Sequence, residues 1–392
     1  MINSLFAQRD TEHWIAPYYA STSFTQALYL STDSTVPITV TIESNNIPLN
    51  NGINVTNGTI TVTKGDPKVV VVPVANIAAN VAADAFNVIN KGLHLTGTAP
   101  FYCTLRMVSG TAHAEILTSK GKAGIGNEFF VAATPSIYSS TGNNFTAGVM
   151  ATEDNTVVTA TWNGQVSFIG GAPTTNTQTF TLQKGQSFIF AGSGSPASNA
   201  GSFIGARIVS NKPITLTNGN MAGNFGLASG SSGTDGILDQ SVPTNRLGNT
   251  FAMVRTLATV NDLEGGIVIA TEDNTQISLN GGTPVATINA GQSYRIDGSN
   301  YIAQGTSGHS NMLVTTSKNV YLYQLVAVGS SNATCGFNYI PPLNCFLPRK
   351  IDEIPFVNQM PINNVSTVTT GTTIKLNILT EAGARSEEHT SE

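Results

Sequence analysis

The chain has 392 residues, of which 40% are hydrophobic and only 10% are charged, and it contains 38 Gly. Because charged residues make up about 25% of an average soluble domain, this low charge, a formal net charge of -5 and the lack of any Lys/Arg cluster argue against nucleic acid and anionic membranes as partners. No apolar run reaches the roughly 18 residues that a membrane-spanning helix needs, so we expect no transmembrane segment.

The start of the chain predicts an exported protein. Residues 4–8, SLFAQ, are similar to the end of a signal peptide with Ala7 at the cleavage position, although the usual positive and apolar regions do not precede them. We therefore interpret residues 1–7 as the remnant of a signal peptide and expect the mature protein to begin near Gln8.

The next segment, RDTEHWIAP (9–17), combines several charges with Trp14. One hypothesis is that Trp14 contributes to a recognition surface. The alternative is that it caps the core of a module, which is the commoner place for a large aromatic side chain.

Blocks of similar sequence recur in the same order along the chain. VMATEDNTVVTA begins at Val149 and VIATEDNTQISL begins at Val268, and matching KGQSF and AGQSY segments follow them. A weaker copy contains LYLSTDSTVPITV at Leu28, and IKLNILTEAGA at Ile374 begins a fourth copy. Tandem repetition of this kind predicts an array of similar modules.

Within each copy, short runs rich in Val, Ile, Thr and Phe are separated by NG, KG and GN turns, which predicts strands. About seven or eight strands fit a repeat of about 110–120 residues, which favours an all-β fold of tandem β-sandwich-like modules. A β-propeller in which each repeat supplies two blades is the alternative. The predicted parts are a signal-peptide remnant (1–7), three β repeats (8–118, 119–240 and 241–350), the start of a truncated fourth repeat (351–384) and an artefactual tail (385–392).

The acidic string TEDNT predicts a turn rather than a catalytic site. In a strand, Glu153 and Asp154 would point to opposite faces and could not act on one substrate as an acid/base pair. A hairpin turn with a left-handed residue explains the string without chemistry, and the predicted turn residues are Asp154, Asn155, Asp273 and Asn274. Calcium binding by Asp154 or Asp273 is the weaker alternative, because calcium takes about six to eight oxygen ligands and no DxDxDG spacing is present.

The loop SSGTDGILDQSVP (231–243) is the second candidate for a recognition surface. It carries Asp235, Asp239 and Gln240 between stretches rich in Gly and Ser. Loops on rigid β modules commonly carry binding function, but a solvated connection is the simpler interpretation.

Other signatures of chemistry are missing from the sequence. It contains no GxSxG, HExxH or phosphate-binding loop, and no CxxC spacing, so we predict no catalytic residue, no metal and no cofactor. Cys335 and Cys345 flank GFNYIPPLN and could close a disulfide loop if the compartment is oxidising, but buried thiols with at most one bridge are the favoured interpretation.

The last eight residues, RSEEHTSE (385–392), back-translate to a sequence similar to a common sequencing-library adapter. We therefore expect that they are artefactual and that the fourth repeat is truncated near Ala384.

Several segments together, RDTEHWIAP, TSKGKAGIGNEFFVAA, IVSNKPITLTNGN, LDQSVPTNRLGNTF and FNYIPPLNCFLPRKIDEI, resemble the IgG Fc-binding protein N-terminal domain family. In particular, the chain looks like the members found in large secreted proteins of gliding-type bacteria, and the resemblance covers nearly all of residues 8–384. It implies an exported or cell-surface protein with a binding or adhesive role and a gliding-associated sorting domain downstream. No motif for contact with IgG Fc can be matched residue by residue.

We therefore predict a non-enzymatic adhesion protein that presents loops to an extracellular glycan, mucin or protein ligand. A passive structural spacer and a polysaccharide-active enzyme are the alternatives. The enzyme would need two carboxylates at a suitable separation in a cleft.

Overall fold

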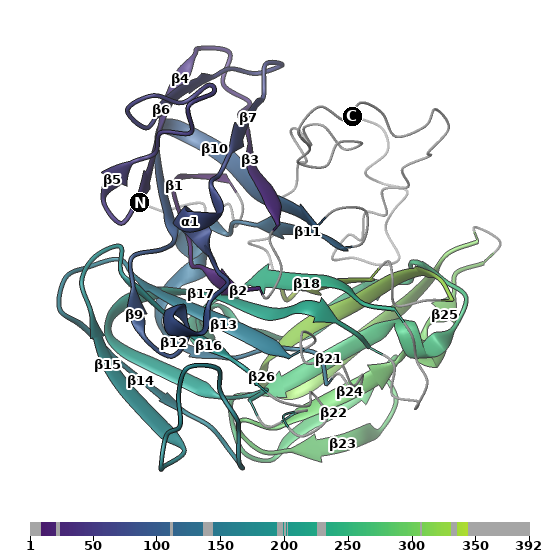
Figure 1. The fold of residues 1–392 in the computed structure, drawn as a ribbon. Coiled ribbons are helices and arrows are strands. Elements are labelled where there is room, and N and C mark those ends of the chain that lie inside the picture. The colour runs from purple at the N-terminus through teal and green to yellow at the C-terminus, as the bar shows by residue number, and fades with distance from the viewer. Residues whose placement is uncertain are drawn as a thin grey trace.

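The computed structural model describes residues 9–20, 24–109, 113–135, 144–193, 199, 201, 203–225, 233–305, 308–330 and 335–343. These residues form three large sheets, and the all-β prediction is confirmed. Figure 1 shows the first sheet in purple and blue above the second in teal and the third in green. The predicted segments 1–7, 351–384 and 385–392 lie outside the described residues, as does Cys345 of the candidate disulfide.

The first sheet is mainly antiparallel and contains β1 (Arg9–Ile15), β3 (Thr25–Ser31), β4 (Ile38–Ser44), β5 (Ile47–Pro48), β6 (Thr59–Val62), β7 (Lys68–Val71), β10 (Leu93–Ser109) and β11 (His113–Thr118). The second contains β9 (Val88–Ile89), β12 (Ile125–Phe130), β13 (Phe145–Ala151), β14 (Thr156–Thr161), β15 (Thr177–Leu182), β16 (Ser187–Ala191), β17 (Arg207–Gly223) and β18 (Asp235–Gln240).

The third sheet contains β19 (Gly248–Val254), β20 (Leu257–Ala258), β21 (Gly265–Ala270), β22 (Thr275–Leu279), β23 (Pro284–Ile288), β24 (Ser293–Asp297), β25 (Ile302–Ala303), β26 (Ser310–Gly329) and β27 (Cys335–Tyr339). A small parallel pair joins β2 (Tyr18–Tyr19) to β8 (Ala78–Ala79). The short helices are α1 (Val74–Ile77), η1 (Ala82–Asp84), η2 (Gly121–Gly124), η4 (Thr244–Arg246), η5 (Asn261–Leu263) and η6 (Gly298–Asn300).

One strand order is repeated three times. It runs β6–β4–β10–β3–β7 in the first sheet, β15–β14–β17–β13–β16 in the second and β23–β22–β26–β21–β24 in the third. In each sheet the first strand (β1, β12 or β19) and the last strand (β11, β18 or β27) also pair with the long strand, which is β10, β17 or β26. We call residues 9–120, 125–242 and 248–339 modules 1, 2 and 3.

The TEDNT string forms a corner and not a hairpin, which corrects the sequence-based prediction. In module 2, β13 pairs with residues 214–220 of β17, and β14 pairs with residues 207–210 of the same strand. The two strands therefore continue in one direction along β17 and do not pair with each other. Pro213 lies in the gap between the two ladders, where a residue without an N–H is tolerated.

The neighbouring first strand is irregular at the same level of every module. The register shifts between Asp10 and Glu12 in β1, between Gly126 and Glu128 in β12, and between Gly248 and Thr250 in β19. Irregularities of this kind bend a strand, so each sheet bends across this line. The long strand runs through the bend and joins both halves in one sheet, which leaves no place for two separate propeller blades in each repeat.

The acidic residues of the corner hold the backbone. The Asp154 carboxylate accepts a hydrogen bond from the Lys184 N–H at 2.9 Å, and in module 3 Asp273 accepts one from the Ala290 N–H at 3.1 Å. The Lys212 amine donates to the Asp154 carbonyl at 2.6 Å, as Lys318 does to Asp273 at 2.8 Å. These carboxylates therefore tie two turns together.

The bend lets both halves of a sheet enclose one core. In module 2, the rings of Phe180 on β15 and Phe188 on β16 stack with centroids 4.1 Å apart, although they lie on either side of the corner. Phe190, Val158 and Leu216 belong to the same buried cluster. Aromatic stacking adds to area burial, so the corner and the core stabilise each other.

Asn155 provides a test of the corner. It has φ 54°, and the equivalent Asn274 has φ 57°; β-branched residues are strongly disfavoured in this left-handed region. We expect Asn155→Val to lower the free energy of unfolding by about 1–2 kcal/mol in urea denaturation. Asn155→Gly, the matched control, should change it little, and equal losses for the two variants would contradict this account.

Candidate functional site

The four residues predicted to line a recognition surface are all buried. Exposed fractions are 2% for Trp14, 7% for Asp235, 3% for Asp239 and 0% for Gln240. Asp235, Asp239 and Gln240 lie on β18, the last strand of module 2, which runs between β11 of module 1 and β27 of module 3. The structure thus brings them to the junction of the three modules instead of an exposed loop.

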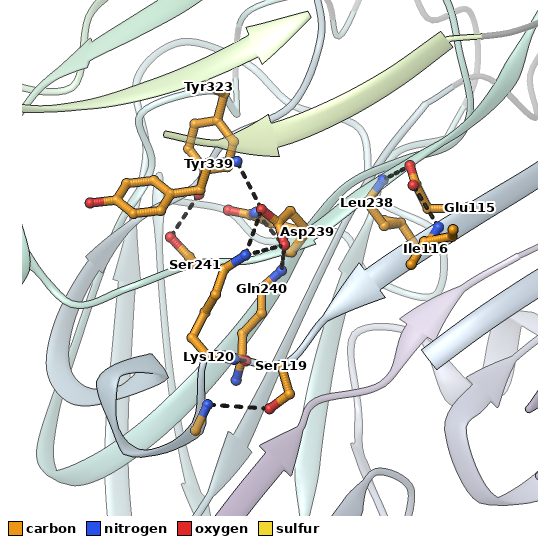
Figure 2. Close-up of polar contacts among 12 residues, drawn as sticks. Glu115, Ile116, Ser119, Lys120, Leu238, Asp239, Gln240, Ser241, Tyr323 and Tyr339 are labelled. Atoms are coloured by element: carbon orange, nitrogen blue, oxygen red, sulfur yellow. Dashed lines mark hydrogen bonds and ion pairs between the residues drawn. The ribbon is translucent and has the colours of Figure 1, made fainter. Parts of the chain in front are cut away.

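Asp239 is the centre of this junction (Figure 2). Its carboxylate lies 2.9 and 3.1 Å from the Lys120 amine of module 1. It also accepts hydrogen bonds from its neighbour, the Gln240 N–H, and from the Tyr339 N–H of module 3, both at 2.8 Å. One carboxylate therefore connects all three modules.

Gln240 extends the network toward the first strand. Its amide oxygen accepts a hydrogen bond from the Lys120 N–H at 2.6 Å. Its amide nitrogen donates to the Trp14 carbonyl and to the Thr215 hydroxyl, each at 2.7 Å. Every polar atom of this fully buried side chain is thus engaged, as burial of an amide requires.

Glu115 and Asp235 join the other end of β11 to β18. Glu115 accepts hydrogen bonds from the Ile116 N–H at 2.7 Å and the Leu238 N–H at 2.8 Å (Figure 2). Asp235 accepts one from the Ala114 N–H at 2.7 Å. These contacts pair β11 with β18 in a parallel alignment through side chains rather than through a backbone ladder.

Module 3 contributes tyrosine hydroxyls to the same region. Tyr323 lies 2.9 Å from the Ser241 hydroxyl, and Tyr321 donates to the Val242 carbonyl at 2.7 Å. Both rings are fully buried, and the Tyr323 ring stacks on Phe337 with centroids 4.5 Å apart. These hydroxyls satisfy module 2 groups that would otherwise be buried without partners.

Trp14 packs in a second polar cluster on the module 1 side. Its ring stacks on the His94 ring at 3.8 Å, and its indole N–H donates to Glu12 at 2.9 Å. His94 lies 3.1 Å from the same Glu12 oxygen, and its hydrogen bond, together with that from Trp14, lowers the pKa of Glu12 to about 2 against the opposing effect of burial. The ring of Trp14 also clusters with Met150 of module 2. This placement agrees with the capping alternative for Trp14.

Burial dominates the electrostatics of the junction. It raises the pKa of Glu115 well above the usual value, and the two N–H donors offset only part of this effect. It also raises the pKa of Asp239, against which the Lys120 charge acts. Charged groups taken out of water are costly unless they are paired, and the Lys120 amine provides this pairing for Asp239.

The junction has no arrangement that would hold a metal. Within the described ranges, no group of three or more His, Cys, Asp or Glu side chains is placed to bind an ion. None of the helices in the same part of the chain is long and apolar enough to cross a membrane. Cys103 is a free thiol and is buried in β10.

Sequence reasoning missed Lys120, Glu115 and Tyr323. Lys120 and Asp239 are 119 positions apart, so no local spacing links them. One signal was available in a chain with only 10% charged residues. Glu115 lies within a strand-like run, and Lys120 lies two residues after the end of that run. Charges at such places are candidates for buried pairs.

A comparison with protein-family models finds a match to the family described as IgGFc binding protein over residues 114–390, well over half of the chain. The chain belongs to the IgGFc-binding family. The resemblance to this family is thereby confirmed over residues 114–390, and the family is one of binding proteins. The curated proteins and the solved structures contain no match to this chain.

Removal of Lys120 tests the junction. In Lys120→Met the Asp239 carboxylate stays buried without its cation, and breaking such a pair costs about 3–5 kcal/mol. We expect a loss of this size in urea denaturation. Lys68→Met, which removes an ion pair to the exposed Asp66, should cost less than about 1 kcal/mol. If Lys120→Met lowered the free energy of unfolding by no more than Lys68→Met does, the junction would not be important for stability.

Glu115 gives a pH test. Its folded pKa lies above the usual 4.5, so the folded state binds the proton more tightly than the unfolded state. The contribution of protonated Glu115 to the free energy of unfolding is therefore fully present below the unfolded pKa. This contribution is lost as the pH rises through the folded pKa. Thermal midpoints measured from about pH 5 to about pH 8 should fall more steeply in the wild type than in Glu115→Gln. Parallel profiles would contradict this expectation.

Proposed function

We propose that this member of the IgGFc-binding family is a non-enzymatic, exported binding protein that presents the hairpin ends of its three modules to a ligand outside the cell. Family membership supports the binding role. One observation supports the proposed location of the binding site. The junction holds the last strands of the three modules, β11, β18 and β27, next to one another.

The hairpins concerned are β10–β11, β17–β18 and β26–β27. Parallel alignment of β11 and β18 is fixed at the start by the Ala114–Asp235 hydrogen bond and at the end by the Lys120–Gln240 hydrogen bond. The first residues of the two strands therefore lie at the same end of the junction. In addition, His113 Nδ1 lies 3.0 Å from the Thr234 carbonyl, which joins the two strand entrances.

The composition of the β17–β18 connection suits this role. Residues 226–232, GLASGSS, are rich in Gly and Ser, a composition whose backbone N–H and C=O groups would serve as the contacts to a partner under this proposal. Loops held by a rigid scaffold lose less entropy on binding than loops on a mobile one. The proposed ligands are IgG Fc, a mucin-type glycoprotein or its glycans, with adhesion as the biological outcome.

The binding test uses the full chain on immobilised IgG Fc, mucin and a glycan array. Replacement of residues 226–232 by a Pro-rich segment of equal length, which removes backbone N–H groups, should weaken binding to the positive ligand about tenfold or more. The matched control replaces residues 172–175 of the β14–β15 connection and should leave the affinity unchanged. Unchanged thermal midpoints for both variants would show that the scaffold is intact.

Two results would contradict the proposal. One is no binding of the wild-type chain to any of the three ligand classes. The other is binding that survives the change at 226–232 and is lost with the change at 172–175.

A further inference from the structure

The two interfaces between modules are built from the same segment. In module 1, the chain that follows the bend of the first strand crosses the sheet of module 2. The Tyr19 N–H donates to the Thr146 hydroxyl at 2.9 Å, and Trp14 packs against Met150. Gly148 lies so near that a Cβ added to it would be 1.7 Å from the Pro17 carbonyl oxygen.

Module 2 approaches module 3 in the same way. Glu12 and Glu128 both follow the register shift of their strand, so Phe130 corresponds to Trp14. Phe130 and its neighbour Val131 belong to one buried cluster with Ile267 and Ile269 of β21. These two isoleucines correspond to Gly148 and Met150, because both pairs precede a TEDNT corner by the same number of residues.

A second contact accompanies each interface. Asn46, in the turn after β4, donates from its amide to the Lys184 carbonyl of module 2 at 2.8 Å. The corresponding turn after β14 brings the Asn163 amide within 3.4 Å of the position of a Cβ on Gly291 of module 3. Each module thus contacts the next through a crossing segment and a turn.

Module 3 carries the same two features with apolar side chains exposed. Thr250 follows the register shift of β19, so Leu257 corresponds to Tyr19. Leu257 is 67% exposed and Val260 is 41% exposed. In the turn after β22, a Cβ on Gly281 would meet no described atom within 4 Å. Exposed apolar groups at a place that is an interface in two other modules indicate a docking surface.

The sequence beyond residue 343 contains a segment of matching chemistry. IKLNILTEAGA (374–384) aligns with β21 and its corner, so Leu376 and Ile378 correspond to Ile267 and Ile269. Ile374 then takes the place of Thr146, which contacts Tyr19 in module 2. All three corresponding residues are apolar, as the exposed Leu257 requires.

We infer that the surface of module 3 around Leu257 docks the fourth module, and that residues 374–379 of this chain are the strand that lies on it. The covalent connection favours this occupant over a second copy of the chain, because an attached segment is present at a high effective concentration. The interface continues an arrangement that modules 1, 2 and 3 already use twice.

The experiment is limited trypsin digestion of the full chain, with cleavage after Lys375 followed by mass spectrometry. Docking protects this bond, so Leu257→Asp should speed its cleavage about tenfold or more. Ile374→Asp should have a similar effect, and the double variant should be cleaved no faster than the faster single variant, because the two residues act on one contact. Ile53→Asp, at a side chain of module 1 that is 70% exposed, is the matched control and should leave the rate unchanged.

The thermal midpoints of all variants are measured in parallel, and Leu257→Ser replaces Leu257→Asp if the latter fails to fold. Cleavage after Lys375 at one rate in wild type and Leu257 variants overturns the inference. So does a wild-type dimer in sedimentation that Leu257→Asp converts to a monomer, because the occupant is then a second copy.

Discussion

The arrangement of the modules depends on one buried carboxylate, that of Asp239. It accepts hydrogen bonds from Lys120 of module 1 and from the backbone of module 3 while it belongs to module 2. A buried ion pair contributes little net stability, because desolvation offsets the attraction. A sheet that shifted by one residue would, however, leave both charges buried and unpaired. We therefore interpret the pair as a device that selects one register among the modules.

Scarcity of charge makes this device effective. With only 10% charged residues, the chain has few alternative partners for a buried Lys or Asp. The surrounding contacts are neutral hydrogen bonds from Gln240, Ser241 and Tyr323, which satisfy the interior without further charge. A connected network of buried hydrogen bonds rigidifies the region that contains it, and rigidity is what loops on a scaffold need in order to bind with little entropy loss.

Much of the fold was predictable from the sequence, because the repeats align and the strand pattern has a period of two. The need for a left-handed residue at Asn155 was also visible, since Asn is among the few residues that tolerate this conformation. The hairpin prediction failed because a corner and a hairpin have the same local sequence. They differ only in the partner strand, and β17 begins more than 50 residues after Asn155. The junction was not predictable for a related reason, since the contact of Lys120 with Asp239 spans 119 positions.

The close approach at Gly148 has a consequence for how such arrays can grow. The spacing between modules 1 and 2 is set where the Pro17 carbonyl lies against a residue without a side chain. Module 3 has Ile267 at the corresponding position, and its interface is filled by Phe130 and Val131 instead. The same crossing segment thus packs against a residue without a side chain in one interface and against a large apolar side chain in the other. The pitch of a longer array would then be adjustable module by module, through the volume of one residue, without any change in strand order.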